Sequence, residues 1–264
     1  MISGLGFTEI IVIGLIIIMF FGSEDLPKLL RMVGEQWGKI RRFTNAARAE
    51  IDTVVKDVTP DLKNEQESSI QIKKQDIRKY IKNKISKMSE NDLEKESAEI
   101  TEKLTTLDQW KNSASIMLFV SLKDEPNTSS LIKKALAGGK RVIVPYCKDK
   151  SGAMGISEIK DPLKDLVEGN YGIQEPKKEL RDNFFTSDIR LIICPGVAFG
   201  KDLSRLGRGK GYYDRFLKNL SGKIPTIGLG YSCQLKEEPI PFDYHDVMMD
   251  TIVTPNDIII RNNS

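Results

Sequence analysis

The residues best suited to chemistry lie between Ile192 and Arg215, in the stretch IICPGVAFGKDLSRLGRGKGYYDR. Glycines alternate with cations from Gly207 to Gly211, and the residues that follow, GYYDRFLKNL, have helical spacing. Glycine lets the backbone approach a ligand closely or adopt a positive φ without strain. Free backbone N–H groups, cations and the positive end of a helix together suit a polyphosphate. The spacing therefore favours a nucleotide-binding loop over the alternative, a flexible surface loop.

This loop matches neither of two common phosphate-binding motifs. The Walker pattern requires Ser or Thr after its Gly-Lys pair, and Gly211 stands there instead. The dinucleotide pattern GxGxxG fails at Tyr212. The prediction of a nucleotide site thus rests on the residue types and their alternation.

The segment PGVAFGKDLSRLGRGKGYYDRFL closely resembles the signature of the 5-formyltetrahydrofolate cyclo-ligase family, also called 5,10-methenyltetrahydrofolate synthetases. The resemblance extends from about Ile72 to Thr254. It implies a ligase that converts ATP and 5-formyltetrahydrofolate into 5,10-methenyltetrahydrofolate, ADP and phosphate. It also implies that Mg²⁺ accompanies the ATP.

The resemblance assigns roles around the phosphates. Lys210 and Arg208 would be the catalytic residues that clamp the transferred phosphoryl group. Lys74 and Arg78 form an i, i+4 pair on one helix face, where both could reach one phosphate chain. Taken alone, that pair is typical of a solvated basic face. The residues that the resemblance places at ATP are Lys74, Arg78, Arg205, Leu206, Gly207, Arg208, Gly209, Lys210, Gly211, Tyr212 and Tyr213.

The folate and magnesium residues also follow from the resemblance. Val120, just before SLKDEPNT, and Glu125, within it, would hold the folate, although Glu125 by itself is typical of an exposed loop carboxylate. The magnesium ligands carry over to Asp214 and Asp246, and two carboxylates suit Mg²⁺, which also takes phosphate oxygens and water. The loop residues expected to touch the folate are Arg208, Gly209, Lys210, Gly211 and Tyr212.

Some neighbouring residues remain open to two interpretations. Tyr212 and Tyr213 could line the pterin side, whereas aromatic residues at a helix start often belong to the core. Asp250 is a weaker candidate for magnesium and would instead fix a strand end. The only histidine, His245, has no second histidine or cysteine nearby in sequence and is interpreted as structural.

Alternating strands and helices must position these residues. Such alternation indicates βαβ units, so we predict an α/β fold with an open, mostly parallel sheet and flanking helices. Ligands of such sheets bind beyond the carboxyl ends of the strands. The elements expected are a helical run Ile72–Leu107, strands Ser115–Val120, Arg141–Pro145, Leu191–Cys194 and Thr251–Thr254, and a helix Thr128–Ala137 that ends at Gly138-Gly139.

Composition narrows the class of protein. The chain has 264 residues and a formal net charge of +3, too small a charge to indicate nucleic-acid binding. Cys147, Cys194 and Cys233 are widely spaced without a CxxC pair, so neither a disulfide framework nor a zinc cluster is expected. A reducing cytoplasm is the natural setting for such a domain.

The N-terminal residues read as a membrane segment. From Ile10 to Phe21 every residue is apolar or glycine, and extension to Leu5 gives about 17 residues, or roughly 25 Å of helix. A signal peptide needs a positive start and a small-residue cleavage site, and MISGLGFTE supplies no cation. Cations follow the apolar run, which predicts a single span with the N-terminus outside and the remainder cytoplasmic.

A basic amphipathic helix is expected after the span. Apolar residues recur at three- and four-residue spacing from Leu26 to Val58, and the helix either lies on the membrane surface or packs in a coiled coil. The order of membrane helix, Phe21-Gly22 hinge, Leu26-Pro27 and basic helix resembles the TatA/TatB family of the twin-arginine translocase. Glu9 matches a polar residue of that family or is simply an interfacial carboxylate, and Ser23 departs from the family pattern.

Together these segments predict four regions and a set of partners. The regions are a transmembrane helix (1–22), an amphipathic helix (23–58), a polar linker (59–69) and a cyclo-ligase-like domain (70–264). The expected partners are 5-formyltetrahydrofolate, ATP, Mg²⁺, the inner cell membrane, and either translocase subunits or further copies of this chain. Two expectations compete with this one: a translocase subunit whose cytoplasmic domain has reduced or no activity, and a folate- or nucleotide-binding module without turnover.

Overall fold

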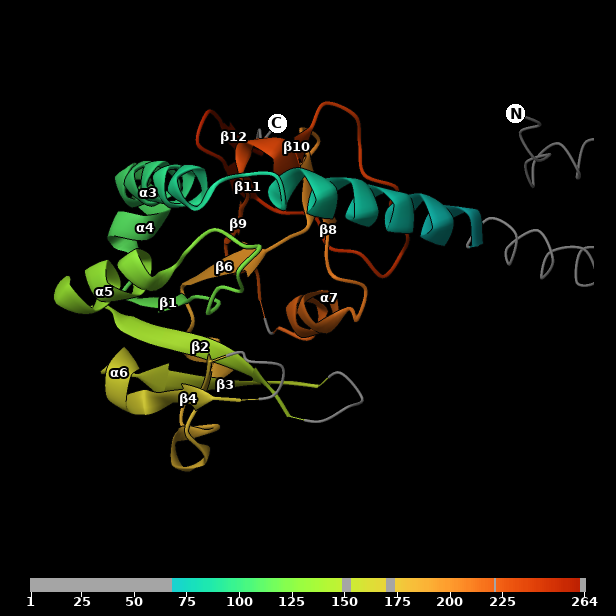
Figure 1. Cartoon of the computed structure of the whole chain (residues 1–264). Coiled ribbons are helices and arrows are strands. Elements are labelled where there is room, and N and C mark those ends of the chain that lie inside the picture. The colour runs from blue at the N-terminus through green and yellow to red at the C-terminus, as the bar shows by residue number, and fades with distance from the viewer. Residues whose placement is uncertain (1–67, 149–152, 170–173, 221, 262–264) are drawn as a thin grey trace, which may run out of the picture. The chain divides into compact units, whose positions relative to one another are not determined.

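A seven-stranded sheet forms the centre of the part of the chain that the structure describes. The computed structural model describes residues 68–148, 153–169, 174–220 and 222–261, all within one compact unit, Glu67–Ser264. The strand order is β12-β11-β9-β6-β1-β2-β3 (Figure 1). The strands are β1 (Ser115–Met117), β2 (Arg141–Cys147), β3 (Met154–Ile159), β6 (Leu191–Pro195), β9 (Thr226–Leu229), β11 (Thr251–Val253) and β12 (Ile258–Ile260).

The inner strands of this sheet are parallel and its edges are antiparallel. β1 pairs in parallel with β2 and β6, β6 pairs with β9, and β9 pairs with β11. β3 and β12 run antiparallel to their neighbours and close the two edges. The prediction of an α/β domain with an open, mostly parallel sheet is therefore confirmed.

Side chains alternate between the two faces of the sheet, so each face has its own core. Ile116 and Leu118 belong to one buried cluster, whereas Met117 between them belongs to the other. Leu191 and Ile192 divide between the two clusters in the same way. This period of two is what a strand dictates, and continuous apolar runs are typical of strands buried on both faces.

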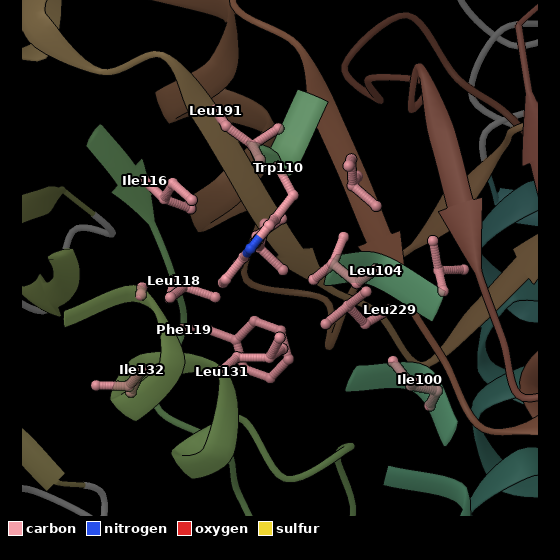
Figure 2. Packing of buried hydrophobic residues seen from close by; sticks show 14 of the residues in the cluster. Ile100, Leu104, Trp110, Ile116, Leu118, Phe119, Leu131, Ile132, Leu191 and Leu229 are labelled. Atoms are coloured by element: carbon pink, nitrogen blue, oxygen red, sulfur yellow. The ribbon is translucent and has the colours of Figure 1, made fainter. Parts of the chain in front are cut away.

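Helices cover both faces. They are the helix of residues 68–85, α3 (Glu90–Thr106), α4 (Asp108–Asn112), α5 (Ser129–Ala137), α6 (Pro162–Asp165) and α7 (Tyr212–Lys218). Figure 2 shows Leu104 of α3, Trp110 of α4 and Leu131 of α5 in one buried cluster with strand residues such as Leu191 of β6. The opposite core takes Phe216 and Leu217 from α7.

The helical run expected over Ile72–Leu107 is two helices in the structure. The first ends at residue 85, and α3 begins at Glu90 after a turn. Ser89 caps α3: its hydroxyl accepts from the Asp92 amide, and the Asp92 carboxylate accepts from the Ser89 amide. Such a reciprocal capping box defines a helix start, which apolar periodicity alone does not reveal.

The stretch after β6 contains small strands where the sequence indicated only a loop. β7 (Ala198–Gly200) pairs with β8 (Arg205–Leu206) and with β10 (Leu235–Lys236) in a second sheet. A third sheet pairs β4 (Leu166–Glu168) with β5 (Gln174–Pro176). β1 is also shorter than predicted, because the chain leaves the strand at Met117.

The N-terminal predictions fall outside the described residues. These are the membrane helix (1–22), the amphipathic helix (23–58) and the first nine residues of the linker (59–67); residues 68 and 69 already belong to the first described helix. None of the helices within the described ranges is long and apolar enough to cross a bilayer.

Candidate active site

The glycine-rich loop joins β8 to α7 and contacts Arg78 of the first described helix. Gly209 and Gly211 have φ values of 104° and 64°, a region that side chains rarely adopt. The Arg78 Nε donates to the Gly207 carbonyl at 2.9 Å. A Cβ atom added at Gly209 would lie 3.6 Å from the Arg78 guanidinium. That separation is an ordinary contact distance, so the positive φ is what requires glycine at position 209.

The helix of residues 68–85 brings its cations inward. Lys74, Arg78, Ile81 and Ile85 share a face by their spacing, and the two isoleucines are buried in the core. Lys74 is consequently only 3% exposed. The sequence expectation that Lys74 and Arg78 share a helix face is met. They contact different partners, because Lys74 bonds carboxylates and Arg78 bonds the glycine loop.

Arg208 connects the glycine loop to the loop after β1. Its guanidinium forms a bidentate pair with Asp124, at 3.1 and 2.5 Å, and its Nε donates to Glu125 at 3.0 Å. Glu125 is 7% exposed, and its other oxygen accepts from the Leu122 amide at 3.0 Å. The carbonyl of Glu125 accepts from the Tyr231 hydroxyl. The glycine loop and the loop after β1 are therefore in contact.

These contacts shift the pKa values of the acids in opposite directions. Burial raises the pKa of Glu125, and the Arg208 charge only partly opposes this. Burial also acts to raise the pKa of Asp124, but the hydrogen bonds and charge of Arg208 outweigh it and lower that pKa. For Arg78, burial lowers the pKa while the Asp246 charge opposes the shift.

The arrangement at the glycine loop suits a phosphate chain. Arg78 and Arg208 are cations beside a loop of backbone amides, and both kinds of group bind phosphate oxygens.

The two predicted magnesium carboxylates lie beside one loop. The Asp214 Oδ1 accepts from the amide of Val247 at 3.2 Å, and Val247 follows Asp246 directly. The Asp246 Oδ2 accepts from Lys74 at 2.5 Å and from the Asp243 amide at 2.8 Å. Within the described residues no group of three or more His, Cys, Asp or Glu side chains could hold a metal. Two carboxylates supplemented by phosphate oxygens and water are a donor set that suits Mg²⁺.

Several residues expected at ATP have buried side chains. Arg205 is 4% exposed and pairs with Asp214, while Leu206 is part of the core. Tyr213 packs against both core clusters, and its hydroxyl has no partner in the described part of the chain. Tyr212 is half-buried beside Arg215, and Lys210 is exposed on the loop.

The structure also describes the contacts of the remaining candidates, Val120, Asp250 and His245. Val120 packs against the core at the start of the loop that carries Glu125. Asp250 accepts from both the amide and the hydroxyl of Thr226, so it fixes the starts of β9 and β11. His245 is exposed and lies against Tyr244, with ring centroids 3.7 Å apart.

Sequence reasoning missed two acids in the site. Asp124 pairs with Arg208, and Asp243 pairs with Lys74 at 2.8 Å. Asp124 is the neighbour of Glu125 in sequence, so its place in the predicted folate loop could have identified it as a site residue. Asp243 belongs to a coil before Asp246, and no spacing rule links that coil to the helix of Lys74.

Comparison with family models identifies two matches. Residues 70–255 match the 5-formyltetrahydrofolate cyclo-ligase family. Residues 3–50 match the TatA/B/E, or mttA/Hcf106, family.

Individual relatives agree with the first match. The chain is 32% identical to a probable 5-formyltetrahydrofolate cyclo-ligase of Schizosaccharomyces pombe over 71% of this chain and 98% of the relative. It is 30% identical to the Mus musculus 5-formyltetrahydrofolate cyclo-ligase, covering 68% of this chain and 92% of the relative. The 5,10-methenyltetrahydrofolate synthetase structure from Aquifex aeolicus superposes with a TM-score of 0.64 at 31% identity, covering 72% and 94%.

Proposed function

Since the chain belongs to the 5-formyltetrahydrofolate cyclo-ligase family, we propose that it converts 5-formyltetrahydrofolate and ATP into 5,10-methenyltetrahydrofolate, ADP and phosphate. The reaction takes place where the glycine loop, the Asp124-Glu125 loop and the helix of residues 68–85 meet. The observation that carries this location is the Arg208 contact to both Asp124 and Glu125, which joins the proposed nucleotide loop to the proposed folate loop.

The main task of the protein in this reaction is to hold ATP and 5-formyltetrahydrofolate so that the γ-phosphoryl group is in line with the formyl oxygen. The formyl oxygen is a poor leaving group, so it first accepts the γ-phosphoryl group and ADP departs. Nitrogen 10 of the folate then attacks the activated carbon, closes the ring, loses its proton and expels phosphate. Lys210 and Arg208 neutralise the negative charge that develops on the transferred group.

Glu125 and Val120 orient the folate in this proposal. The Glu125 carboxylate is held from two sides, by Arg208 and by the Leu122 amide, so it presents a fixed acceptor beside the apolar Val120. Phosphate oxygens of bound ATP would compete with Asp124 for Arg208. Asp124 is the partner to be displaced, because its pair with Arg208 is more exposed than that of Glu125.

Mg²⁺ would be held by Asp214 and Asp246. Each carboxylate has one oxygen without a donor from the described residues, which fits a cation that completes its shell with phosphate and water. When bound, Mg²⁺ supplies charge neutralisation on the phosphates of ATP.

The direct test is ATP-dependent formation of the methenyl chromophore by the purified full-length protein. We expect a rise in absorbance that requires ATP, 5-formyltetrahydrofolate and Mg²⁺ together. Absence of turnover from folded protein would reject the ligase reaction and leave the competing proposal, a translocase subunit with an inactive domain.

For residues 1–58 we propose a membrane tether that keeps the enzyme domain on the cytoplasmic side of the inner membrane. The match of residues 3–50 to the TatA/B/E family supports this, as does the uncharged run from Ile10 to Phe21. The same match favours a second role, association with twin-arginine translocase subunits or with copies of this chain.

A further inference from the structure

We propose that the outer edge of β12 is a self-association surface, on which a second copy of this chain pairs antiparallel through its own β12. The central sheets of the two protomers then continue into one another across a two-fold axis. This surface belongs to the enzyme domain and is distinct from residues 1–58. Pairing there needs neither ATP nor folate, so it can be tested apart from the ligase reaction.

The two edges of the central sheet differ in how they are covered. At the β3 edge, the Asp182 amide donates to the Ile156 carbonyl at 3.2 Å. The Asn183 side chain accepts from the Glu158 amide at 2.7 Å and donates to the Glu158 carbonyl at 3.2 Å. At the opposite edge, β12 pairs with β11 alone among the described strands (Figure 1). An uncovered edge is a template for pairing with another strand.

The backbone of β12 directs two residues outward. The Arg261 amide donates to the Asp250 carbonyl at 2.9 Å, so the backbone of Arg261 faces the side of β11. Alternate residues of an antiparallel strand direct their N–H and C=O groups to opposite edges, so those of Ile258 and Ile260 point away from β11. Outside the β11 ladder, no hydrogen bond among the described residues engages the backbone of Ile258 or Ile260. Both residues can therefore bond to a further strand.

The side chains along this edge are apolar and exposed. Ile259 packs against one of the two cores, whereas Ile258 and Ile260 point to the opposite face of the sheet. Ile258 is 37% exposed and Ile260 is 51% exposed. Burial of these isoleucines against apolar side chains of another strand would remove apolar surface from water and so favour pairing.

The order of residues along the edge makes it complementary to itself. With the two-fold axis at Ile259, Ile258 lies opposite the partner's Ile260, and the outward backbone groups of this pair exchange two hydrogen bonds. The same register sets Asp257 opposite the partner's Arg261, and opposite charges across a strand pair are favourable. Arg261 lies 3.6 Å from Asp250 and would be shared between the two carboxylates. A shift of two residues in either direction sets Ile259 opposite a charged residue instead.

The experiment is oxidative cysteine cross-linking of the full-length protein, in a background with Cys147→Ser and Cys233→Ser that keeps only the buried Cys194. Ile259→Cys places two thiols at a non-hydrogen-bonded pair on the axis, where Cα atoms lie about 4.5 Å apart and a disulfide can form. Asn256→Cys is the matched control, because its two exposed thiols would lie about 20 Å apart along the paired strands. We expect the disulfide-linked dimer to form at least about 10-fold faster from Ile259→Cys than from Asn256→Cys.

Ile260→Pro, added to the Ile259→Cys protein, tests the backbone bonds. Proline removes the outward N–H of residue 260 and leaves the groups that face β11 in place, a substitution that edge strands tolerate. We expect the cross-linking rate to fall to that of Asn256→Cys. Ile258→Lys combined with Ile260→Lys covers the case in which proline prevents folding, because lysines would then face each other across the axis. The same loss of cross-linking is expected, and the unfolding midpoint reports whether each variant is folded.

Equal cross-linking rates for Ile259→Cys and Asn256→Cys in folded protein would overturn the proposal, and coverage of β12 by another part of the chain would give this result. An Ile259→Cys dimer that forms as fast with lysine at positions 258 and 260 would also overturn it. Association through residues 1–58 would raise both rates alike, so the ratio of the rates reports β12 pairing alone. The chromophore assay still decides the ligase reaction, whichever result is obtained.

Discussion

At the scale of single residues, the cations of the candidate site fall into an exposed group and a buried group. Lys210 and Arg208 are exposed on the glycine loop, whereas Lys74 and Arg205 are enclosed by carboxylates and carbonyls. Lys210 is exposed between two glycines of the predicted phosphate loop. It is therefore the better candidate for contact with the transferred phosphoryl group.

Lys210→Ala should lower kcat by about 10²–10³-fold, which is typical when a transition-state donor is removed. The unfolding midpoint should remain that of the parent, because Lys210 is exposed. The chromophore assay gives the rate. Lys201→Ala is the matched control, because Lys201 is an exposed lysine in the turn between β7 and β8 and pairs with Glu237. A Lys210→Ala rate above about half that of the parent would remove Lys210 from the mechanism.

The adjacent acids Asp124 and Glu125 should change the free energy of unfolding with pH in opposite directions. Burial raises the folded pKa of Glu125 above its ordinary value of 4.5. The contribution of Glu125 to the free energy of unfolding is therefore fully present below pH 4.5 and is lost as the pH rises through the folded pKa. Relative to the parent, Glu125→Gln should therefore gain stability as pH rises from roughly 4 to 7.

Asp124→Asn is the internal control for this prediction. Arg208 outweighs burial and lowers the folded pKa of Asp124, so that contribution is present above the ordinary pKa and is lost as pH falls through the folded one. Urea unfolding of the parent and both variants across the pH range measures the two slopes. Slopes of the same sign would contradict the assignment.

At the scale of elements, helix boundaries decide where the site residues point. The first helix ends before Ser89, and α3 starts at Glu90 with a reciprocal cap. This break lets the helix of Lys74 and α3 pack separately on one face of the sheet. Ile81 of the first helix and Ile100 of α3 belong to the same buried cluster.

Ser89→Ala should lower the free energy of unfolding by about 1 kcal/mol, the usual cost of losing a capping hydroxyl. The reason is that the Asp92 amide loses its acceptor. Urea unfolding measures the loss, and kcat should not change. Ser86→Ala tests whether the effect is specific, since the Ser86 hydroxyl only donates to the Asn83 carbonyl in the preceding turn. Equal stability of Ser89→Ala and the parent would show that the cap contributes nothing.

At the scale of the whole molecule, the sheet and both of its cores lie within Glu67–Ser264. Every residue proposed for ATP, folate or Mg²⁺ lies in the same unit. The predicted membrane segment and amphipathic helix precede it in sequence. Tethering and chemistry should therefore be separable.

A shortened chain that begins at Glu67 should be soluble and should turn over at a rate close to that of the full-length protein. Residues 1–60 fused to a soluble reporter should carry the reporter to the membrane, on the cytoplasmic side. Fractionation with the chromophore assay measures both. Glu9→Ala in the full-length chain should leave ligase activity unchanged, since Glu9 precedes the enzyme unit. A shortened chain that is inactive, or a full-length protein found in the cytosol, would contradict this separation.

The sequence alone determined the fold class and the identity of most candidate residues. Apolar runs such as Leu191–Cys194, the alternation of strands with helices, and the glycine-cation loop are local patterns, and local patterns are set by backbone sterics and side-chain periodicity. The family resemblance rested on such a contiguous stretch, and the family match of residues 70–255 bears it out.

Only the tertiary structure decided which charge meets which. Lys74 and Asp246 are 172 positions apart, and Arg208 and Glu125 are 83 apart. No periodicity connects such positions, because their contact depends on how the strands order in the sheet and how the coils between them close. The same holds for Arg205, which the resemblance placed at ATP. Its burial against Asp214 and Pro195 follows from the packing of β8 beside α7 and could be seen only once the fold was complete.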